Sequence, residues 1–457
     1  MIEEFEYTGE WWLPDEPETR LSGTLRYTPT DRAVLDLIGY FKGDRGSYRV
    51  LYPEIILGNA SMGREDQPFG KEITLYKCFM RKLICGSSGS ERQLFDADVT
   101  FVGTHFQKPG DIKFRSLSIH YSYLDEWVNI SGFDIRTNKG ETVIKYKKPE
   151  PIQAIINDDC KVSIDFEIAH SPIDIVQKEA SVKQKTCVKI ETSEQKSFEE
   201  HREIMRNIQS FLSLGVTEAV YPLAIKGIER HPPVKIYYGL SNIPKAFKTL
   251  YPFDMLFTFG DISDRFEVFL RNWFEKADLL QPIYDLHSGI LYNPHMYLTQ
   301  AFLSMVQAIE SYHRRAMRNY ELPEEEHEKR IEEILSTVPE NHKGWLKSKL
   351  AYSNEPSLRE RLNEVFDKHL EIANKCMENK RAFIQKVVDT RNYLTHYGSR
   401  LKARAATGEE LFHITQKLRI LLQICLLTEL GFSLEEIKGF FFRNYRYRQE
   451  FTQEQLI

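Results

Sequence analysis

The segment spanning residues 387–398 places an arginine, an asparagine and a histidine at one end of an apolar helical pattern. Arg391 lies four residues after Val387, so a helix would carry both side chains on one face. A charged guanidinium cannot be left alone in a dry core. Arg391 therefore needs an acidic partner, a subunit interface or an anionic ligand.

The histidine of this segment stands where it can add acid–base chemistry. Asn392 and His396 are four residues apart and share a neighbouring helix face, and Gly398 predicts the end of that helix. Arginine binds phosphate and stabilises charge that develops in a transition state. Histidine transfers protons near neutral pH. Arg391, Asn392 and His396 are therefore a candidate phosphodiester-cleaving site.

The Arg-x4-His spacing alone is a weak signal. The chain contains a second match, from Arg115 to His120, in a predicted strand where positions five apart face opposite sides, and we attribute it to chance. Arg391 and His396 also have a structural interpretation, as an ion pair at the edge of a core and a histidine that caps a helix. The spacing leaves the catalytic and the structural interpretation open.

Other kinds of site have less support in the sequence. The thirteen histidines include no His-Glu-x-x-His pair and the six cysteines no Cys-x-x-Cys pair, so we expect no metal site. Residues 86–90 are rich in glycine and serine but lack the lysine of a phosphate-binding loop, which indicates a flexible turn. Trp11 and Trp12 are expected in the core or at the edge of a β domain rather than on a recognition surface.

Length and composition limit the class of protein. A chain of 457 residues with 42% apolar and 28% charged residues is typical of a soluble protein of two or three domains. A net charge of −5 gives no overall basic field, so any contact with nucleic acid must come from a local patch. Scattered cysteines, and no apolar run of about 18 residues, predict a cytoplasmic protein that does not cross a membrane.

The first 195 residues are predicted to be rich in strands. Residues 162–168 alternate between apolar and polar side chains, and residues 116–123 do the same, as half-buried strands do. Turn signals such as that at residues 138–140 separate these segments. We expect a sandwich or an open barrel over residues 1–195, followed by a mixed α/β connecting region over residues 196–288.

The period of the apolar residues becomes helical over residues 289–457. Asn293 and Pro294 predict the start of a long helix whose apolar residues recur every three or four positions. Residues 324–333 are highly charged and predict a solvated helix or loop. Residues 433–436 form a capping box before a short final helix. The fold class is therefore α+β, with a β-rich N-terminal region and a C-terminal all-α bundle.

The residues around the candidate site resemble a known family. Residues 389–397 resemble the Arg-Asn-x-x-x-His signature of the HEPN superfamily, and VVDTRNYLTHYG is similar to its ApeA-like branch. Other stretches that resemble this branch are AFLSMVQAIESYHRR (301–315), LLQICLLTELGFS (421–433), and, from its N-terminal region, residues 11–41 and 208–227.

The resemblance implies a metal-independent ribonuclease that acts as an abortive-infection effector against phage. It implies attack by the neighbouring 2′-hydroxyl, no cofactor, and pairing of two copies so that their Arg/His motifs meet. A glutamate of the early helix, Glu310, becomes an acidic partner, although an exposed pair between Glu310 and Arg314 explains that residue equally well. The expected site residues are the catalytic Arg391, His396, Asn392 and Glu310, and the RNA-binding Tyr397 and Arg400.

The expected partners follow from the same resemblance. They are an RNA substrate, with tRNA as a candidate, a phage protein as a candidate trigger sensed by the N-terminal region, and further copies of the chain. In HEPN proteins that are nucleotidylated, a tyrosine lies two residues after the histidine, whereas Gly398 occupies that position here. The alternative function is a non-catalytic RNA-binding or dimerisation module joined to a ligand- or protein-binding N-terminal domain.

Overall fold

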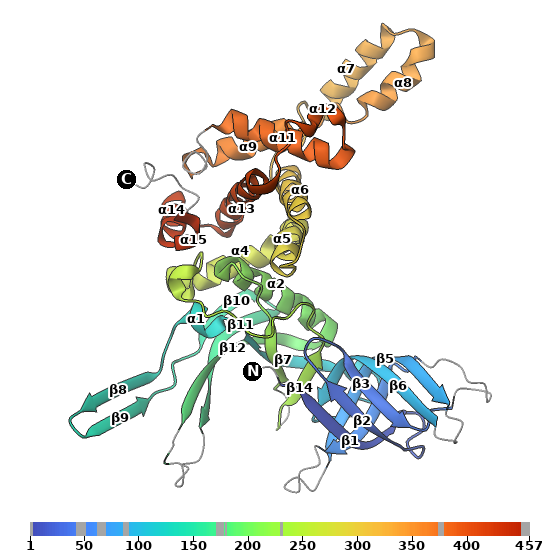
Figure 1. The fold of residues 1–457 in the computed structure, drawn as a ribbon, viewed down its shortest axis with the longest axis vertical. Helices are drawn as coiled ribbons and strands as arrows, with labels where there is room; N and C mark the ends of the chain where they lie inside the picture. The colour runs from blue at the N-terminus through green and yellow to red at the C-terminus, as the bar shows by residue number, and fades with distance from the viewer. Residues whose placement is uncertain are drawn as a thin grey trace. The chain divides into compact units, whose positions relative to one another are not determined.

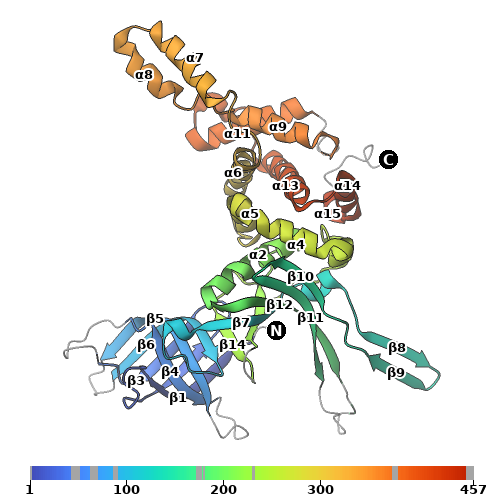
Figure 2. The ribbon, with the colours of Figure 1, turned by 180° about the vertical axis from the view of Figure 1, so that it is seen from behind.

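The computed structural model describes two compact units, one rich in strands and one helical (Figures 1 and 2). The residues that it describes are 3–42, 52–61, 70–85, 91–170, 178, 181–228, 232–372 and 379–448. The first unit consists of Met1–Val216, Val220–Pro252 and Thr258–Arg271, and the second of Thr217–Ala219, Phe253–Phe257 and Asn272–Ile457. The glycine- and serine-rich residues 86–90 lie outside the described residues.

Six antiparallel strands of the first unit close into a barrel. They are β1 (Phe5–Trp12), β2 (Leu21–Tyr27), β3 (Ala33–Ile38), β4 (Ile55–Ser61), β5 (Lys71–Cys85) and β6 (Glu91–Val102). Their order is β6-β3-β2-β1-β4-β5, and β5 pairs back with β6. The predicted β-rich region is confirmed, and its barrel is closed rather than open.

Strand β6 also begins a second, extended sheet. Its residues 92–97 pair with β3, whereas residues 99–102 pair along the same edge with β14 (Val234–Tyr238). The sheet continues antiparallel from β14, and its remaining strands are, in order, β13 (Pro222–Gly227), β7 (Lys113–Tyr121), β12 (Val182–Ser197), β11 (Cys160–His170) and β10 (Ile152–Asn157). A separate hairpin consists of β8 (Phe133–Asn138) and β9 (Glu141–Tyr146).

A helix covers one face of the extended sheet. Helix α2 (Phe198–Val216) packs against β7 and β12, and the Tyr121 hydroxyl donates a hydrogen bond to the Met205 carbonyl oxygen at 3.0 Å. The alternation along β7 therefore places Leu117, Ile119 and Tyr121 under α2. The first unit also contains α1 (Leu124–Val128) and α3 (Phe259–Ile262), and α4 (Phe266–Glu275) spans the boundary between the units.

Trp11 and Trp12 are both buried in the β-rich unit, as predicted, and Trp11 belongs to the core of the barrel whereas Trp12 packs against His105. Their exposed fractions are 0% and 6%. The Trp11 Nε1 donates a hydrogen bond to the Gly23 carbonyl oxygen at 3.1 Å, which satisfies the polar atom of the buried ring. Gly58 on β4 lies against the same ring, and a Cβ atom at Gly58 would overlap it.

The second unit is a helical bundle around α13. Its helices are α5 (Ala277–Leu291), α6 (Leu298–Ala316), α7 (Glu324–Ser336), α8 (Glu340–Leu350), α9 (Leu358–Lys368), α11 (Lys380–His396), α12 (Ser399–Lys402), α13 (Gly408–Leu430), α14 (Leu434–Arg443) and α15 (Tyr445–Arg448). Of the short 3-10 turns, Pro109–Asp111 and Ser263–Arg265 belong to the first unit, and Pro252–Asp254 lies where the chain passes between the units. By length and composition α13 is apolar enough to cross a membrane, but 67% of its most apolar window is buried, as in the core helix of a bundle.

The predicted helix boundaries are partly right. The helix expected at Asn293 and Pro294 starts instead at Leu298, because a turn closed by the Met296 amide and the Asn293 carbonyl oxygen comes first. The charged segment 324–333 is a helix without buried residues, as expected. The capping box at Ser433 is confirmed, since its hydroxyl accepts a hydrogen bond from the Glu436 amide.

Gly58→Ala is expected to lower the free energy of unfolding of the first unit by about 1–3 kcal/mol, because the new methyl group displaces the Trp11 ring. Chemical denaturation followed by tryptophan fluorescence measures the change. Gly110→Ala is the control, because a Cβ atom at Gly110 meets nothing within 4 Å. Wild-type stability of Gly58→Ala would contradict this account of the barrel core.

Two histidines of the second unit are buried as neutral rings. The exposed fractions of His287 and His369 are 4% and 2%. Burial lowers the pKa of each ring to about 4, and the nearby cations Arg419 and Lys368 act in the same direction. The unfolded chain therefore binds more protons than the folded chain between about pH 6.5 and pH 4.

Because the two buried rings must stay neutral, the second unit is expected to have its full free energy of unfolding above pH 6.5 and to lose part of it as the pH falls towards 4. At pH 4.5 the loss is about 2–3 kcal/mol for each histidine. Urea denaturation at pH 7 and pH 4.5 measures it. His369→Leu should lose less stability than the wild type between the two pH values, whereas the exposed His342→Leu should not differ from it. An equal loss in all three proteins would refute the assignment.

Candidate functional site

Helix α11 positions the predicted Arg/His motif. The helix begins at Lys380, where the Asn379 side chain accepts a hydrogen bond from the Ala382 amide at 3.0 Å. An apolar face on its N-terminal half is buried, and Val387 on that face is 0% exposed. One turn further on, Arg391 is half-buried and His396 is exposed as the last residue of the helix. The end of α11 thus emerges from the core.

Arg391 faces a hollow between α6 and α11 of about 390 Å³. Its Nη1 donates a hydrogen bond to the Asn392 Oδ1 at 3.1 Å. Within the part of the chain that the structure describes, the Arg391 guanidinium has no ion pair. The residues that line the hollow are Leu303, Val306, Gln307, Glu310, Ser311 and Arg314 from α6, and Arg391 and Thr395 from α11.

Glu310 lines this hollow together with Arg391. Glu310 forms an ion pair with Arg314 at 3.3 Å, one turn along α6, and Arg314 forms a second pair with Glu355 at 2.5 Å. Both interpretations of Glu310 from the sequence therefore have a structural counterpart: it faces the hollow, and it pairs with Arg314. Among the described residues, Glu310 thus forms its ion pair with Arg314 and not with Arg391.

A buried arginine on α9 lies behind this ion-pair network. Arg361 is 0% exposed, and it donates hydrogen bonds to the His313 Nδ1 at 3.0 Å, the Asn319 Oδ1 at 2.5 Å and the Glu355 carboxylate at 3.1 Å. The His313 Nε2 lies 2.7 Å from the Glu364 carboxylate. Burial lowers the pKa of Arg361, and the charge of Arg314 lowers it further.

Arg361 was not among the site residues predicted from the sequence, although its position in the helical pattern marks it. Arg361 lies three residues after Leu358 and four before Val365, so it falls on the apolar face of its helix, as Arg391 does. An arginine at an apolar position of a helical pattern is the signal for both residues. This pattern does not distinguish an arginine that is paired inside the protein from one that is not.

The end of α11 differs from the expectation in one residue. Tyr397 adopts the left-handed conformation that ends the helix, with φ of 51°, and its amide donates to the Tyr393 carbonyl oxygen at 2.6 Å. Gly398, which was predicted to end the helix, has an ordinary φ of −65°. His396 is nevertheless in the last turn, as predicted, but it does not line the hollow that contains Arg391.

A basic surface adjoins the end of α11. Tyr397 is 70% exposed, and its ring lies 5.5 Å from that of Tyr393. Arg400 and Lys402 on α12 are exposed and form no ion pair with any residue that the structure describes. These cations provide the kind of local patch that a chain of net negative charge needs for contact with RNA.

The remaining candidates for chemistry are weak. No group of three or more histidine, cysteine, aspartate or glutamate residues among the described residues could hold a metal ion. Arg115 and His120, the second match to the spacing, occupy odd and even positions of β7 and bind different carbonyl oxygens, those of Ser193 and Thr186. Strand geometry therefore separates this pair.

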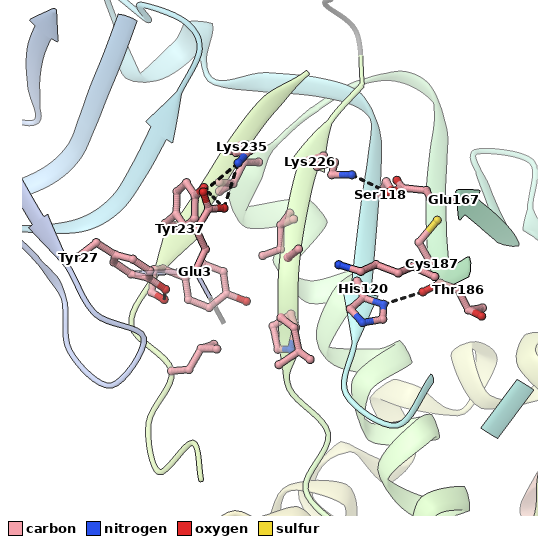
Figure 3. Close-up of a pocket in the computed structure, with 18 residues that line it drawn as sticks. Glu3, Tyr27, Ser118, His120, Glu167, Thr186, Cys187, Lys226, Lys235 and Tyr237 are labelled. Atoms are coloured by element: carbon pink, nitrogen blue, oxygen red, sulfur yellow. Dashed lines mark hydrogen bonds and ion pairs between the residues drawn. The ribbon is translucent and has the colours of Figure 1, made fainter. Parts of the chain in front are cut away.

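The first unit contains a cavity of about 340 Å³ on the sheet face away from α2. Ala224 on β13 lines it and is exposed. Burial raises the pKa of the Cys187 thiol beside it to about 11, so this thiol is a poor nucleophile at neutral pH. Figure 3 shows two charged clusters in the cavity, one of Lys235, Glu3 and Tyr237 and the other of Lys226 and Glu167.

The charged side chains of this cavity are largely paired with one another. Lys226 lies 2.7 Å from the Glu167 carboxylate, and Lys235 lies 3.0 Å from that of Glu3. The Tyr237 hydroxyl donates to Glu3 at 2.8 Å. The cavity therefore has the size of a small-ligand site, but its charges do not specify a ligand class.

Comparison with protein families assigns both parts of the chain. The family model described as Apea-like HEPN matches residues 303–436, so the helical unit contains a HEPN domain. The model described as ApeA N-terminal domain 1 matches residues 6–273, more than half of the chain. The chain belongs to the ApeA-like HEPN family of anti-phage effectors, as the sequence resemblance predicted. No curated protein and no solved structure matches it.

Proposed function

We propose that the helical unit is a metal-independent endoribonuclease and that Arg391 and His396 are its catalytic pair. One observation carries the proposal. Arg391 is half-buried beside a hollow of about 390 Å³, and it forms no ion pair with any carboxylate among the described residues. A cation in this position favours an anionic ligand, and the phosphate of RNA supplies one.

Each proposed catalytic residue has a defined task. The 2′-hydroxyl of a ribose attacks the adjacent phosphorus, the bond from phosphorus to the 5′-oxygen breaks, and a 2′,3′-cyclic phosphate and a 5′-hydroxyl result. Arg391 binds the non-bridging oxygens and stabilises their charge in the transition state. His396 takes up the proton that the 2′-hydroxyl loses and returns a proton to the departing 5′-oxygen. Asn392 orients the guanidinium through the hydrogen bond of 3.1 Å, and Glu310 limits the positive charge of the hollow.

RNA is expected to extend from the hollow along the end of α11. The exposed ring of Tyr397 offers a surface on which a base can stack, and Arg400 offers a charge for a neighbouring phosphate. We infer that tRNA is a candidate substrate, that the active form contains at least two copies, and that the enzyme works in the cytoplasm. His396 lies outside the hollow of its own chain, which agrees with a composite site.

The alternative is a non-catalytic RNA-binding or dimerisation module. The ion pair between Glu310 and Arg314 favours it, because the acidic residue then has a structural role that is complete without RNA. The two functions differ in one respect. A binding module retains RNA without breaking it, whereas the proposed enzyme releases cyclic phosphate ends.

Arg391→Ala and His396→Ala are each expected to lower RNA cleavage by at least about 100-fold, because each removes transition-state stabilisation or proton transfer. Cleavage of labelled RNA by the purified protein, in the presence of a chelator, measures the rate. Matched controls are Arg381→Ala, exposed near the start of α11, and His413→Ala, exposed on α13, which should both cut at the wild-type rate. Wild-type cleavage by His396→Ala would eliminate the proposal.

We further propose that the N-terminal unit senses the trigger, a phage protein, and that its cavity contributes to recognition. Ala224→Trp is expected to fill the cavity without disturbing the core, because Ala224 is exposed. Cells that carry this variant should lose protection against a phage that the wild type restricts, as counted in plaques. Val143→Trp on the exposed β9 is the control. Full protection by Ala224→Trp would place recognition elsewhere.

A further inference from the structure

Helices α7 and α8 form a hairpin that extends from the rest of the helical unit (Figures 1 and 2). Neither helix contains a buried residue. They have 13 and 11 residues, and helices this short are marginal in water unless they pack against another surface. The hairpin therefore lacks most of the burial that would stabilise it within one copy of the chain.

Apolar residues lie on two sides of this hairpin. Leu335 on α7 and Leu346 on α8 are half-buried, as expected where the two helices contact one another. Ile334 and Trp345, each adjacent in sequence to one of them, are 38% and 64% exposed. Exposed large apolar side chains, a tryptophan above all, are typical of the centre of a protein interface.

The two helices of the hairpin carry opposite charge. Helix α7 contains six glutamates and two basic residues, a net charge of −4, and α8 contains one glutamate and three lysines, a net charge of +2. Within the described residues the hairpin's own ion pair joins Lys343 to Glu340, both on α8. The charges of Lys347 and Lys349, and those of Glu332 and Glu333, remain available to a partner.

We propose that the α7–α8 hairpin docks onto the same hairpin of a second copy, with α7 of each copy against α8 of the other. A two-fold interface must be self-complementary, and an acidic helix beside a basic helix meets this condition. A partner that is uniformly acidic or uniformly basic would attract one helix and repel the other. The exposed Trp345 and Ile334 then become the apolar centre of the contact.

The base of the hairpin connects this interface to the candidate site. The Asn354 side chain exchanges two hydrogen bonds with the Leu322 backbone, each of 3.0 Å, which joins the two ends of the hairpin. The next residue, Glu355, accepts from both Arg314 and the buried Arg361. The base of the hairpin is therefore connected through Glu355 to the Arg314–Glu310 pair that lines the hollow of Arg391, and the relevance of this connection to the nuclease rests on the proposed function.

Charge reversal on the full-length chain tests the interface without RNA. One variant carries Lys347→Glu and Lys349→Glu, and a second carries Glu332→Lys and Glu333→Lys. Sedimentation velocity should give a dimer for the wild type and a dissociation constant raised at least ten-fold for each variant alone. An equimolar mixture of the two variants should recover the dimer, because glutamates and lysines then face one another again at the substituted positions of both helix pairs.

Two further chains complete the experiment. A chain with all four substitutions has the charges exchanged at these four positions and should bind more tightly than either variant alone, which separates loss of pairing from loss of folding. A chain with Lys139→Glu and Lys145→Glu on the β8–β9 hairpin is the control and should also dimerise normally. A monomeric wild type, unchanged association of either variant, or a mixture that stays monomeric would overturn the proposal. Association is measured without RNA cleavage, so absence of nuclease activity would leave this result unaffected.

Discussion

The helical unit is organised by the requirement that a guanidinium removed from water must have its charge and its hydrogen bonds satisfied. Arg361 meets most of this requirement inside the protein, because its Nη1 and Nη2 donate to His313, Asn319 and Glu355, whereas its Nε has no hydrogen-bond partner among the described residues. Arg391 is one helix away and does not, since an amide oxygen is its hydrogen-bond partner within the described chain. The two arginines thus differ in their surroundings: Arg361 joins residues of several segments, and Arg391 has no ion pair among the described residues.

The ion pairs that begin at Arg361 extend to the hollow beside Arg391, because Arg314 and Glu310 line it. Glu355 is shared by Arg314 and Arg361, and Arg314 reaches Glu310 with its other nitrogen. Positive and negative charges thus alternate from the core to the wall of the hollow. Arg391 lies at this wall and is not part of the alternating series, since it forms no ion pair among the described residues.

The sequence predicted the parts of this protein that follow from local rules. The apolar period of α6 and α11, the capping box at Ser433 and the burial of Trp11 each depend on neighbours along the chain or on hydrophobicity. The Arg/His motif could be placed at the end of a helix for the same reason. Its role as a catalytic pair remains a prediction.

What the sequence did not predict depends on long-range pairing. Closure of the barrel rests on contacts between β5 and β6 and between β1 and β4, whose register no local pattern encodes. The convergence of Glu310, Arg314 and Arg391 requires α6 to lie beside α11, and the role of Arg361 requires Asn319 and Glu355 to meet it from both ends of the α7–α8 hairpin.

Strand β6 is shared by two sheets, and this sharing affects how the N-terminal unit unfolds and how it can evolve. Because it hydrogen-bonds to β5 on one edge and to β3 and then β14 on the other, it belongs to the barrel and to the extended sheet at once. Neither part can lose this strand without opening the other. The two sheets should therefore melt as one cooperative block, and recombination during evolution would have to exchange them together.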